Sequence, residues 1–174
     1  GKVWAKAFGA TPVIQEENAY HAQTFWGVEP PPSGHKFWGI FDREGWKNMD
    51  PMPGALEACL MLKEAGHRLI CITSMPKHKR EDRLKNLQNL GFPIDDVLAV
   101  GHSRTKDKNP KKEAIDNLCP DLFIDDELRK LKDLSCATVL IDPPGCPDSP
   151  NEGKDDSFVS LRTESLLDFA KIFT

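Results

Sequence analysis

Two pairs of polar residues stand directly after short apolar runs of the sequence. One run is followed by Thr73 and Ser74, and a later run is followed by Asp125 and Asp126. Adjacent carboxylates offer hard oxygen ligands, which suit a Mg²⁺ ion that keeps several of its waters. Hydroxyl and backbone N–H groups at a neighbouring position can hold phosphate oxygens. Together the two pairs predict a site for a phosphoryl group and a magnesium ion.

A cluster of lysines lies between the two polar pairs. Its members are Lys106, Lys108, Lys111 and Lys112. Pro110 suits the first turn of a helix, and a lysine near a helix start adds positive charge where a phosphate would bind. Hydroxyls, a lysine and two carboxylates can stabilise a transferring phosphoryl group electrostatically, which is most of what such catalysis requires.

Each of these features also has an ordinary structural explanation. Asp125 and Asp126 could cap the helix that follows them, because carboxylates stabilise helix N-termini. Thr73 and Ser74 could form a turn, and a lysine cluster is usually a solvated face. The order of hydroxyl pair, lysines and acidic pair along one chain favours the phosphate and metal site over three separate coincidences.

The elements that must position these residues alternate between helix and strand from residue 51 onward. We expect helices at 55–65, 77–90, 111–118 and 127–133, strands at 69–72, 97–100, 122–124 and 137–141, and a last helix capped by Thr163. Short branched apolar runs between helices indicate buried parallel strands. The pattern therefore predicts an α/β fold, a doubly wound parallel sheet with helices on both faces. Ligands of such sheets bind beyond the carboxyl ends of the strands, where the polar pairs stand.

Residues 1–50 have a different composition. They contain all four Trp residues, the single Tyr and three consecutive prolines. Short helices and loops are the expected content, with aromatic side chains that form a small core or face a partner or pocket. We therefore divide the chain into a small helical cap, residues 1–50, which is not an independent domain, and an α/β core, residues 51–174.

The overall composition restricts the class of protein and of partner. The 174 residues include 23 Lys and Arg against 27 Asp and Glu, a net charge of −4, which argues against a nucleic acid polymer as the partner. No apolar run approaches the roughly 18 residues of a membrane helix, so no membrane partner is expected. Five cysteines without a Cys-x-x-Cys spacing fit a reducing compartment, so we expect a cytoplasmic location. The sequence predicts no oligomeric state.

Several of these segments together resemble the haloacid dehalogenase-like (HAD) hydrolases. The resemblance covers about residues 50–142 and rests on Pro53-Gly54-Ala55 with its helix, Ile70-Cys71-Ile72-Thr73-Ser74, Lys111 or Lys112, and Phe123-Ile124-Asp125-Asp126. The Pro-Met-Pro-Gly-Ala segment and the Thr-Ser strand end are most similar to the 5′(3′)-deoxyribonucleotidase branch, which also has a small helical cap. The resemblance implies a Rossmann-like core and Mg²⁺-dependent hydrolysis of a small phosphomonoester, with a nucleoside monophosphate as the leading substrate.

The resemblance also implies roles for particular residues. The residues that contact the phosphoryl group would be Thr73 with Ser74, and Lys111 with Lys112 and Lys108 as alternatives, since one sequence does not fix the register of the lysine. The residues that hold Mg²⁺ would be Asp125 and Asp126.

The reaction of this family also needs an Asp-x-Asp motif after a strand. Its first Asp is the nucleophile that forms an aspartyl-phosphate, and its second is the general acid and base. No Asp-x-Asp occurs before Thr73, and the nearest match is Asp42-Arg43-Glu44-Gly45, in which Asp42 would be the nucleophile. The alternative is about 10–20 residues upstream of Gly1 that contain the strand and its motif. We favour it because the first strand of the family is central, and its absence would leave backbone groups of a buried sheet unpaired.

A second hypothesis is a catalytically inactive HAD-like module that binds a phosphorylated ligand or a partner, because the nucleophile motif is missing from these 174 residues. The natural N-terminal sequence separates the two hypotheses. A phosphoacceptor receiver domain also combines acidic residues with Thr and Lys. It is disfavoured because its acidic pair comes early in the chain, whereas this one comes late.

Overall fold

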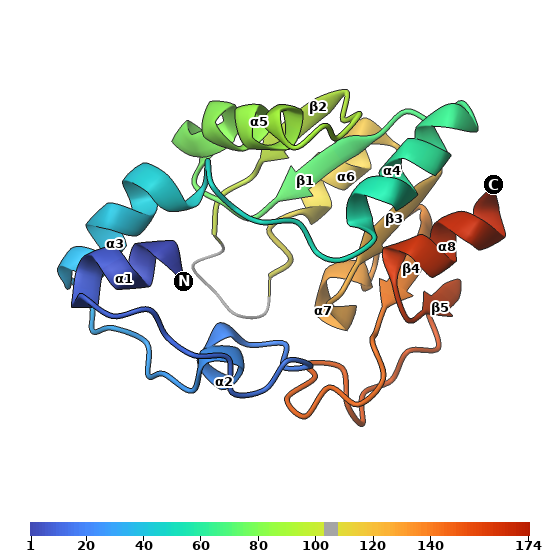
Figure 1. Cartoon of the computed structure of the whole chain (residues 1–174). Coiled ribbons are helices and arrows are strands. Elements are labelled where there is room, and N and C mark those ends of the chain that lie inside the picture. Colours follow the sequence, from blue (N-terminus) through green and yellow to red (C-terminus); the bar gives the residue numbers. More distant parts are fainter. Residues whose placement is uncertain (103–107) are drawn as a thin grey trace. The chain divides into compact units, whose positions relative to one another are not determined.

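The short apolar runs of the sequence form parallel strands, as their alternation with helices predicts (Figure 1). The computed structural model describes residues 1–102 and 108–174, so the predicted Lys106 lies outside the described residues. The strands are β1 (Ile70–Thr73), β2 (Asp96–Ala99), β3 (Leu122–Asp125), β4 (Ala137–Ile141) and β5 (Leu161–Thr163). The sequence did not indicate β5, because three residues are too few to show a periodic pattern.

Helices precede and follow these strands. They are α4 (Ala55–Glu64), the 3₁₀ turn η2 (Lys77–Lys79), α5 (Arg80–Asn89), α6 (Lys112–Leu118), α7 (Leu128–Leu131) and α8 (Leu166–Phe173). Gly66 and Gly91, which follow α4 and α5, have φ values of 92° and 82°. Glycine adopts this left-handed conformation without steric cost, so both helices end close to where the sequence predicts. Within the ranges that the structure describes, no helix is both long enough and apolar enough to cross a membrane.

Among the described residues, the strands form two sheets rather than the single sheet that we expected. β1 pairs with β2, and Ile70 lies opposite Asp96. β3 pairs with β4, and β4 pairs with β5. β1 and β3 are not hydrogen-bonded to each other, so each of them has an unpaired edge. The two sheets still share a core, because Ile72 of β1 and Phe123 of β3 belong to one cluster of buried side chains.

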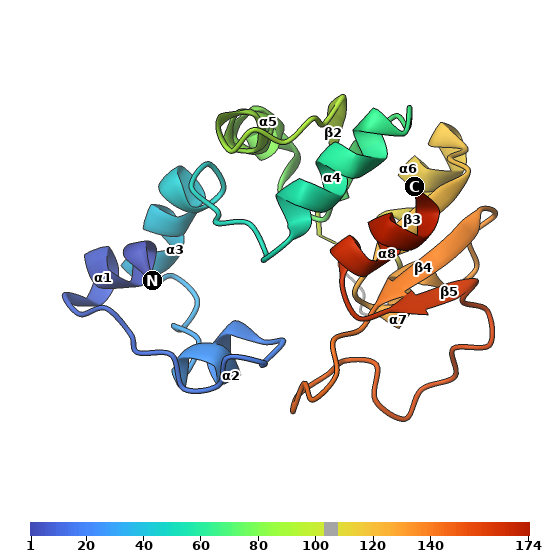
Figure 2. The ribbon, with the colours of Figure 1, turned by 45° about the vertical axis from the view of Figure 1, so that its right-hand side comes forward.

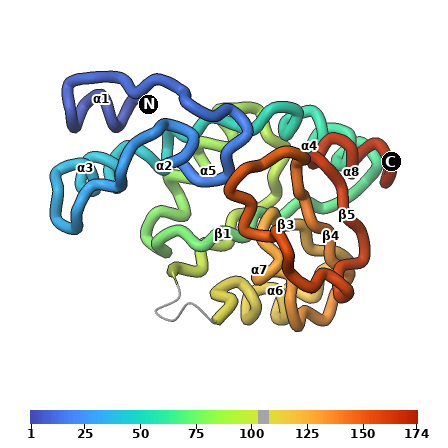
Figure 3. The backbone as a smooth tube through the Cα atoms, turned by 90° about the horizontal axis from the view of Figure 1, so that it is seen from below, coloured from blue at the N-terminus to red at the C-terminus, as the bar shows by residue number. Residues whose placement is uncertain are grey.

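Helices cover both faces of the sheet that contains β4. On one face, Ile115 of α6 and Leu131 of α7 belong to one core cluster with Leu140. On the other face, Phe169 of α8 packs in a second cluster with Val139. Figure 3 shows α6 and α7 on one side of β3 and β4, with α4 and α8 on the other, and Figure 2 shows α8 beside α4. Neighbouring residues of β4 are thus buried on opposite faces, which confirms the predicted α/β fold.

The start of α8 differs from the prediction. Ser165, and not Thr163, caps the helix, because the Ser165 hydroxyl oxygen accepts a hydrogen bond from the backbone N–H of Asp168 at 3.1 Å. Thr163 is the last residue of β5, and its hydroxyl donates to the backbone oxygen of Ser165 at 3.1 Å. Serine and threonine both suit a helix N-cap, so the sequence alone did not separate the two positions.

Ser165→Ala is expected to lower the free energy of unfolding by about 1 kcal/mol, because the backbone N–H of Asp168 loses its acceptor. Ser165→Thr keeps a hydroxyl at the same position and is expected to cost less. Urea unfolding of both variants beside the wild-type protein measures the difference. An equal loss of stability in the two variants would contradict the capping role.

The structure divides into two units, and the first contains residues 1–50 and 144–150. Its helical elements are α1 (Lys2–Phe8), α2 (Ala22–Trp26), α3 (Lys36–Ile40) and the π-helical turn η1 (Phe41–Gly45). The rings of Trp4 and Phe8 stack with centroids 4.2 Å apart, and Phe8 stacks on His35 at 4.7 Å. These aromatic side chains therefore stack on one another, but Phe8 is 43% exposed, so the described contacts form a half-exposed cluster rather than the small core that was one of the two expectations.

Asp148 holds the loop 144–150 to α2 within this first unit. Its carboxylate accepts hydrogen bonds from the backbone N–H groups of Tyr20 at 2.7 Å and His21 at 3.2 Å. The Thr24 side chain, together with these two N–H groups, lowers the pKa of Asp148 to about 2. The ionised carboxylate is therefore the form that binds the start of α2.

Asp148→Asn is expected to loosen the start of α2. The pKa of Asp148 in the folded protein lies below its ordinary value of 3.8, so its stabilising effect is present above about pH 4 and is lost as the pH falls toward 2. Hydrogen–deuterium exchange near neutral pH should show faster exchange of the Tyr20 and His21 amides in the variant. Glu152→Gln removes an exposed charge nearby in the chain, and exchange at these amides should match the wild type.

Candidate phosphate and metal site

The candidate site is built from residues of the second unit, 51–143 and 151–174. Thr73 is the last residue of β1 and Asp125 is the last residue of β3. Ser74 and Asp126 follow them in the chain. Both polar pairs therefore stand at the carboxyl ends of strands, as the sequence predicts, and each of these two strands has an unpaired edge among the described residues.

A buried ion pair joins Lys111 to Asp125. The Lys111 Nζ lies 2.5 Å from the Asp125 Oδ2 and 5.6 Å from the ring centroid of Phe123. The side chains of Lys111 and Asp125 are 15% and 5% exposed. The Asp125 Oδ1 accepts a hydrogen bond from the backbone N–H of Glu127 at 3.1 Å. A carboxylate has about four acceptor positions, so Asp125 retains the capacity to bind a cation.

The charge of Lys111 also acts on β1. Burial raises the pKa of the Cys71 thiol, and the positive charges of Arg83 and Lys111 oppose this rise. Cys71 lies within β1, whereas Asp125 ends β3. The ammonium group of Lys111 therefore influences residues of both β1 and β3.

Asp126 shows the electrostatic effect of two neighbouring carboxylates. The pKa of Asp126 is raised to about 6. The largest cause is loss of hydration, and the second is repulsion from the Asp125 carboxylate. The Asp126 side chain keeps contact with solvent, so densely packed surroundings rather than complete enclosure cause the loss of hydration. A divalent cation beside the pair would relieve the repulsion.

The donor set of the site fits Mg²⁺. In the part of the chain that the structure describes, no group of three or more His, Cys, Asp or Glu side chains is arranged to hold a metal ion. The donors at this site are two carboxylates, Asp125 and Asp126, one of them open to solvent. Mg²⁺ commonly binds through one or two carboxylates and takes its remaining ligands from water and substrate phosphate.

Ser74 carries a buried hydroxyl oxygen that has no hydrogen-bond partner among the described residues. Buried polar atoms are normally paired, and an unpaired one costs about 1–3 kcal/mol. The turn around it is fixed, because Val100 N–H donates to the backbone oxygen of Thr73 and Gly101 N–H donates to that of Met75, both at 2.9 Å. The Ser74 hydroxyl is thus held at the end of β1 with its capacity to bind an oxygen ligand unused.

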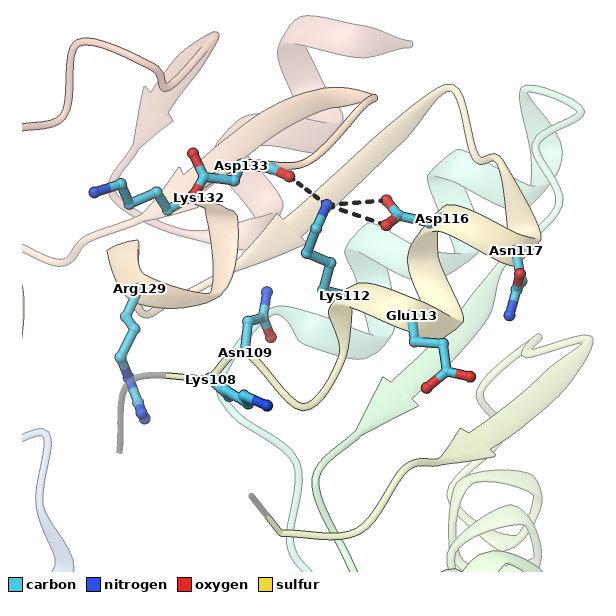
Figure 4. Close-up of a pocket in the computed structure, with 9 residues that line it drawn as sticks. All are labelled: Lys108, Asn109, Lys112, Glu113, Asp116, Asn117, Arg129, Lys132 and Asp133. Atoms are coloured by element: carbon cyan, nitrogen blue, oxygen red, sulfur yellow. Dashed lines mark hydrogen bonds and ion pairs between the residues drawn. The ribbon is translucent and has the colours of Figure 1, made fainter. Parts of the chain in front are cut away.

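Lys112 and Lys108 take different positions from Lys111. Figure 4 shows both in the lining of a surface hollow beside α6. The Lys112 Nζ donates to the backbone oxygen of Asp133 at 2.5 Å and lies 3.0 Å from the carboxylate of Asp116. Of the three lysines considered, the geometry therefore favours Lys111 as the lysine of the site.

Asp42 belongs to the first unit and lies in η1. The apolar run before it forms the helix α3, whereas the nucleophile motif of the family follows a strand. The carboxylate of Glu44, the second acid of this segment, pairs with Lys6. Asp42 therefore lacks the backbone setting of that motif, and the structure gives its catalytic role no support.

Two residues that the sequence did not single out lie buried near the acidic pair. Lys130 is 8% exposed and Asn151 is 4% exposed. The Lys130 Nζ lies 3.8 Å from the Glu127 carboxylate, and burial lowers the pKa of this lysine. Asn151 hydrogen-bonds to the backbone of Asp126 and Leu128. No local pattern marks either residue, because Lys130 stands in a charged helix and Asn151 in a loop.

The fold and part of the sequence are similar to known proteins, although no family model matches the chain. A crystal structure of an L-2-haloacid dehalogenase matches with a TM-score of 0.54 and 18% sequence identity, over 87% of this chain and 66% of that one. This likeness shows a haloacid dehalogenase-like α/β fold. A protein of Oceanobacillus iheyensis described as a "Putative nucleotidase" is 40% identical over 76 residues, which are 43% of this chain and 38% of that protein. The match thus spans less than half of that relative.

Proposed function

We propose that the protein is a Mg²⁺-dependent phosphomonoester hydrolase of the HAD type. The observation that carries this proposal is the buried pair of Lys111 and Asp125, with Asp126 beside it, at the carboxyl end of a strand. Phosphoryl transfer depends on such placed cations and metal-binding carboxylates. The haloacid dehalogenase-like fold supports the class. The name of the Oceanobacillus relative supports a nucleoside monophosphate as the substrate.

Each residue of the site has a defined task in this proposal. Asp125 and Asp126 would hold Mg²⁺, which would neutralise charge on the phosphoryl oxygens. Lys111 forms an ion pair with Asp125 and adds a positive charge at the same place. The hydroxyls of Thr73 and Ser74 would donate hydrogen bonds to the phosphoryl oxygens.

We further propose that the nucleophile is an Asp on a strand upstream of Gly1 that pairs with the unpaired edges of β1 and β3. Its carboxylate oxygen would attack phosphorus, the ester P–O bond would break, and the leaving oxygen would take a proton from the second Asp of the motif. Water would then attack the phosphorus of the aspartyl-phosphate, return a proton to that Asp and release phosphate. The unpaired edges support a strand here, because unpaired backbone groups in a buried sheet cost free energy.

The test is hydrolysis of p-nitrophenyl phosphate, and then of nucleoside 5′- and 3′-monophosphates, by the natural full-length protein. We expect turnover with Mg²⁺, none with EDTA, and none in the Asp125→Asn variant. Metal-independent turnover, or a folded full-length protein without turnover on any phosphomonoester, would contradict the proposal.

A second function is a catalytically inactive HAD-like module that binds a phosphorylated ligand or partner, and the setting of Asp42 in a π-helical turn after a helix favours it. Within the described residues, no strand that carries an Asp bridges β1 and β3. If this second function holds, the full-length protein will bind inorganic phosphate in a calorimetric titration, and Lys111→Met will weaken that binding, but no substrate of the panel will be hydrolysed.

A further inference from the structure

Asn151 joins the loop after β3 to the end of β4. Its side chain is buried, and its Oδ1 accepts a hydrogen bond from the backbone N–H of Leu128 at 2.9 Å. Its Nδ2 donates to the backbone oxygen of Asp126 at 3.0 Å and to the Asp142 Oδ1 at 3.1 Å. One planar amide thus serves an N–H, a C=O and a carboxylate that come from two separate loops.

The loop 126–128 is held from within by the buried Leu128 side chain and by the hydrogen bond from the Lys130 N–H to the Glu127 oxygen, neither of which binds the backbone of Asp126. The helix that follows it, α7, has four residues, and so short a helix has little stability by itself. The carboxylate of Asp125 holds the backbone N–H of Glu127. Asn151 holds the backbone groups on both sides of that residue, at Asp126 and Leu128. Two side chains therefore fix three consecutive residues of the loop.

We propose that Asn151 is a positioning residue for the metal site. By fixing the backbone at Asp126, it keeps the carboxylates of Asp125 and Asp126 directed at one Mg²⁺ ion. This inference rests on the proposed function, because it takes the acidic pair as the Mg²⁺ ligands. Residues that orient metal ligands without touching the ion commonly contribute about 10- to 100-fold to metal affinity.

The hydrogen-bonding groups of the Asn151 amide allow an experiment to separate the positioning role from an effect of charge alone. An Asp at position 151 would keep the acceptor for Leu128 but lose both donors, and it would place a second carboxylate beside Asp142. Charge attraction alone predicts that the added negative charge strengthens cation binding. Positioning predicts the opposite, because the backbone oxygen of Asp126 loses its donor. Asn151→Asp therefore gives opposite results under the two explanations.

The test is a calorimetric titration of Mg²⁺ into the full-length protein, with Asn151→Ala, Asn151→Asp and Asn86→Ala beside the wild type. We expect about 10- to 100-fold weaker binding in both Asn151 variants. Asn86, on α5, is buried to the same 4% exposure and is the matched control. Its replacement removes an equally buried amide, and we expect the Mg²⁺ affinity to stay within about twofold of the wild type.

A second measurement, without metal, reports on the loop itself. In hydrogen–deuterium exchange of the metal-free protein, we expect the amides of Glu127 and Leu128 to exchange about 10-fold faster in Asn151→Ala than in the wild type. We expect their exchange rates in Asn86→Ala to equal those of the wild type. Wild-type Mg²⁺ binding with equal or tighter binding in Asn151→Asp would overturn the positioning role and leave the proposed function intact. A wild-type protein that binds no Mg²⁺ would overturn the proposed function, and the positioning role with it.

Discussion

Lys111→Met is expected to lower the free energy of unfolding by about 3 kcal/mol and to reduce phosphomonoester hydrolysis at least about 100-fold. The stability is lost because the carboxylate of Asp125, whose side chain is 5% exposed, stays buried without its counter-ion. The activity is lost because a fixed charge at a phosphoryl site commonly contributes about 10²–10³ to the rate. Urea unfolding and hydrolysis of p-nitrophenyl phosphate by the full-length protein measure the two effects.

The neighbouring lysine provides the matched control. Lys112 pairs with Asp116, and their side chains are 43% and 38% exposed, so Lys112→Met is expected to change stability by less than about 1 kcal/mol and to leave hydrolysis unaffected. Lys108→Met is expected to behave in the same way. Equal losses in the Lys111 and Lys112 variants would remove the distinction that the structure draws between these lysines.

A double variant separates the structural from the chemical contribution of the pair. Lys111→Met with Asp125→Asn leaves no unpaired buried charge, so it is expected to regain most of the stability that Lys111→Met loses. Hydrolysis is expected to remain absent, because both the lysine and a metal-binding carboxylate are gone. If the double variant is no more stable than Lys111→Met, the loss comes from packing and not from the buried charge.

The strands that end at Thr73 and Asp125 could be predicted because their signal is local. A short branched apolar run between helices, followed at once by polar residues, is typical of a buried parallel strand. The same local signal placed a lysine before the helix at 111–118. This signal did not decide between Lys111 and Lys112. Two adjacent residues in the first turn of a helix point in different directions, and the sequence pattern does not define the first residue of the helix exactly.

The features that could not be predicted depend on partners far away in the chain. Asn151 contacts Asp126 and Leu128 across 25 and 23 positions, and its own loop shows no periodic pattern. The separation of β1 from β3 is different, because the family resemblance implies it: the first strand of the family is central, and without it these two edges have no partner among the described residues. The cap of α8 was misplaced by two residues because Thr163 and Ser165 have equivalent local chemistry.

Asp126→Asn is expected to stabilise the metal-free protein while it removes Mg²⁺-dependent hydrolysis. The pKa of Asp126 is about 6 in the folded protein against an ordinary value of 3.8, so the folded state binds the proton more tightly than the unfolded chain. That contribution favours folding at low pH and is lost as the pH rises from about 4 to 6. A shift of this size corresponds to about 3 kcal/mol. Because the side chain is exposed to solvent, which screens the repulsion, we expect a gain of about 1 kcal/mol at neutral pH.

Urea unfolding in EDTA and in excess Mg²⁺ tests this prediction, because the more stable of the two proteins should differ between the two media. In EDTA the variant should match the wild type below about pH 4 and exceed it above about pH 6. In Mg²⁺ at about 100 times the dissociation constant, the wild type gains about 2.7 kcal/mol and should become the more stable protein. Asp155→Asn is the control, because it changes a second acidic pair that lies in an exposed loop. Hydrogen bonds from Ser157 lower the pKa of Asp155, so this variant should not be more stable than the wild type in EDTA. Equal stability of Asp126→Asn and wild type in both media would contradict the prediction. A reversal would show that the repulsion which destabilises the metal-free protein is the interaction that the cation removes.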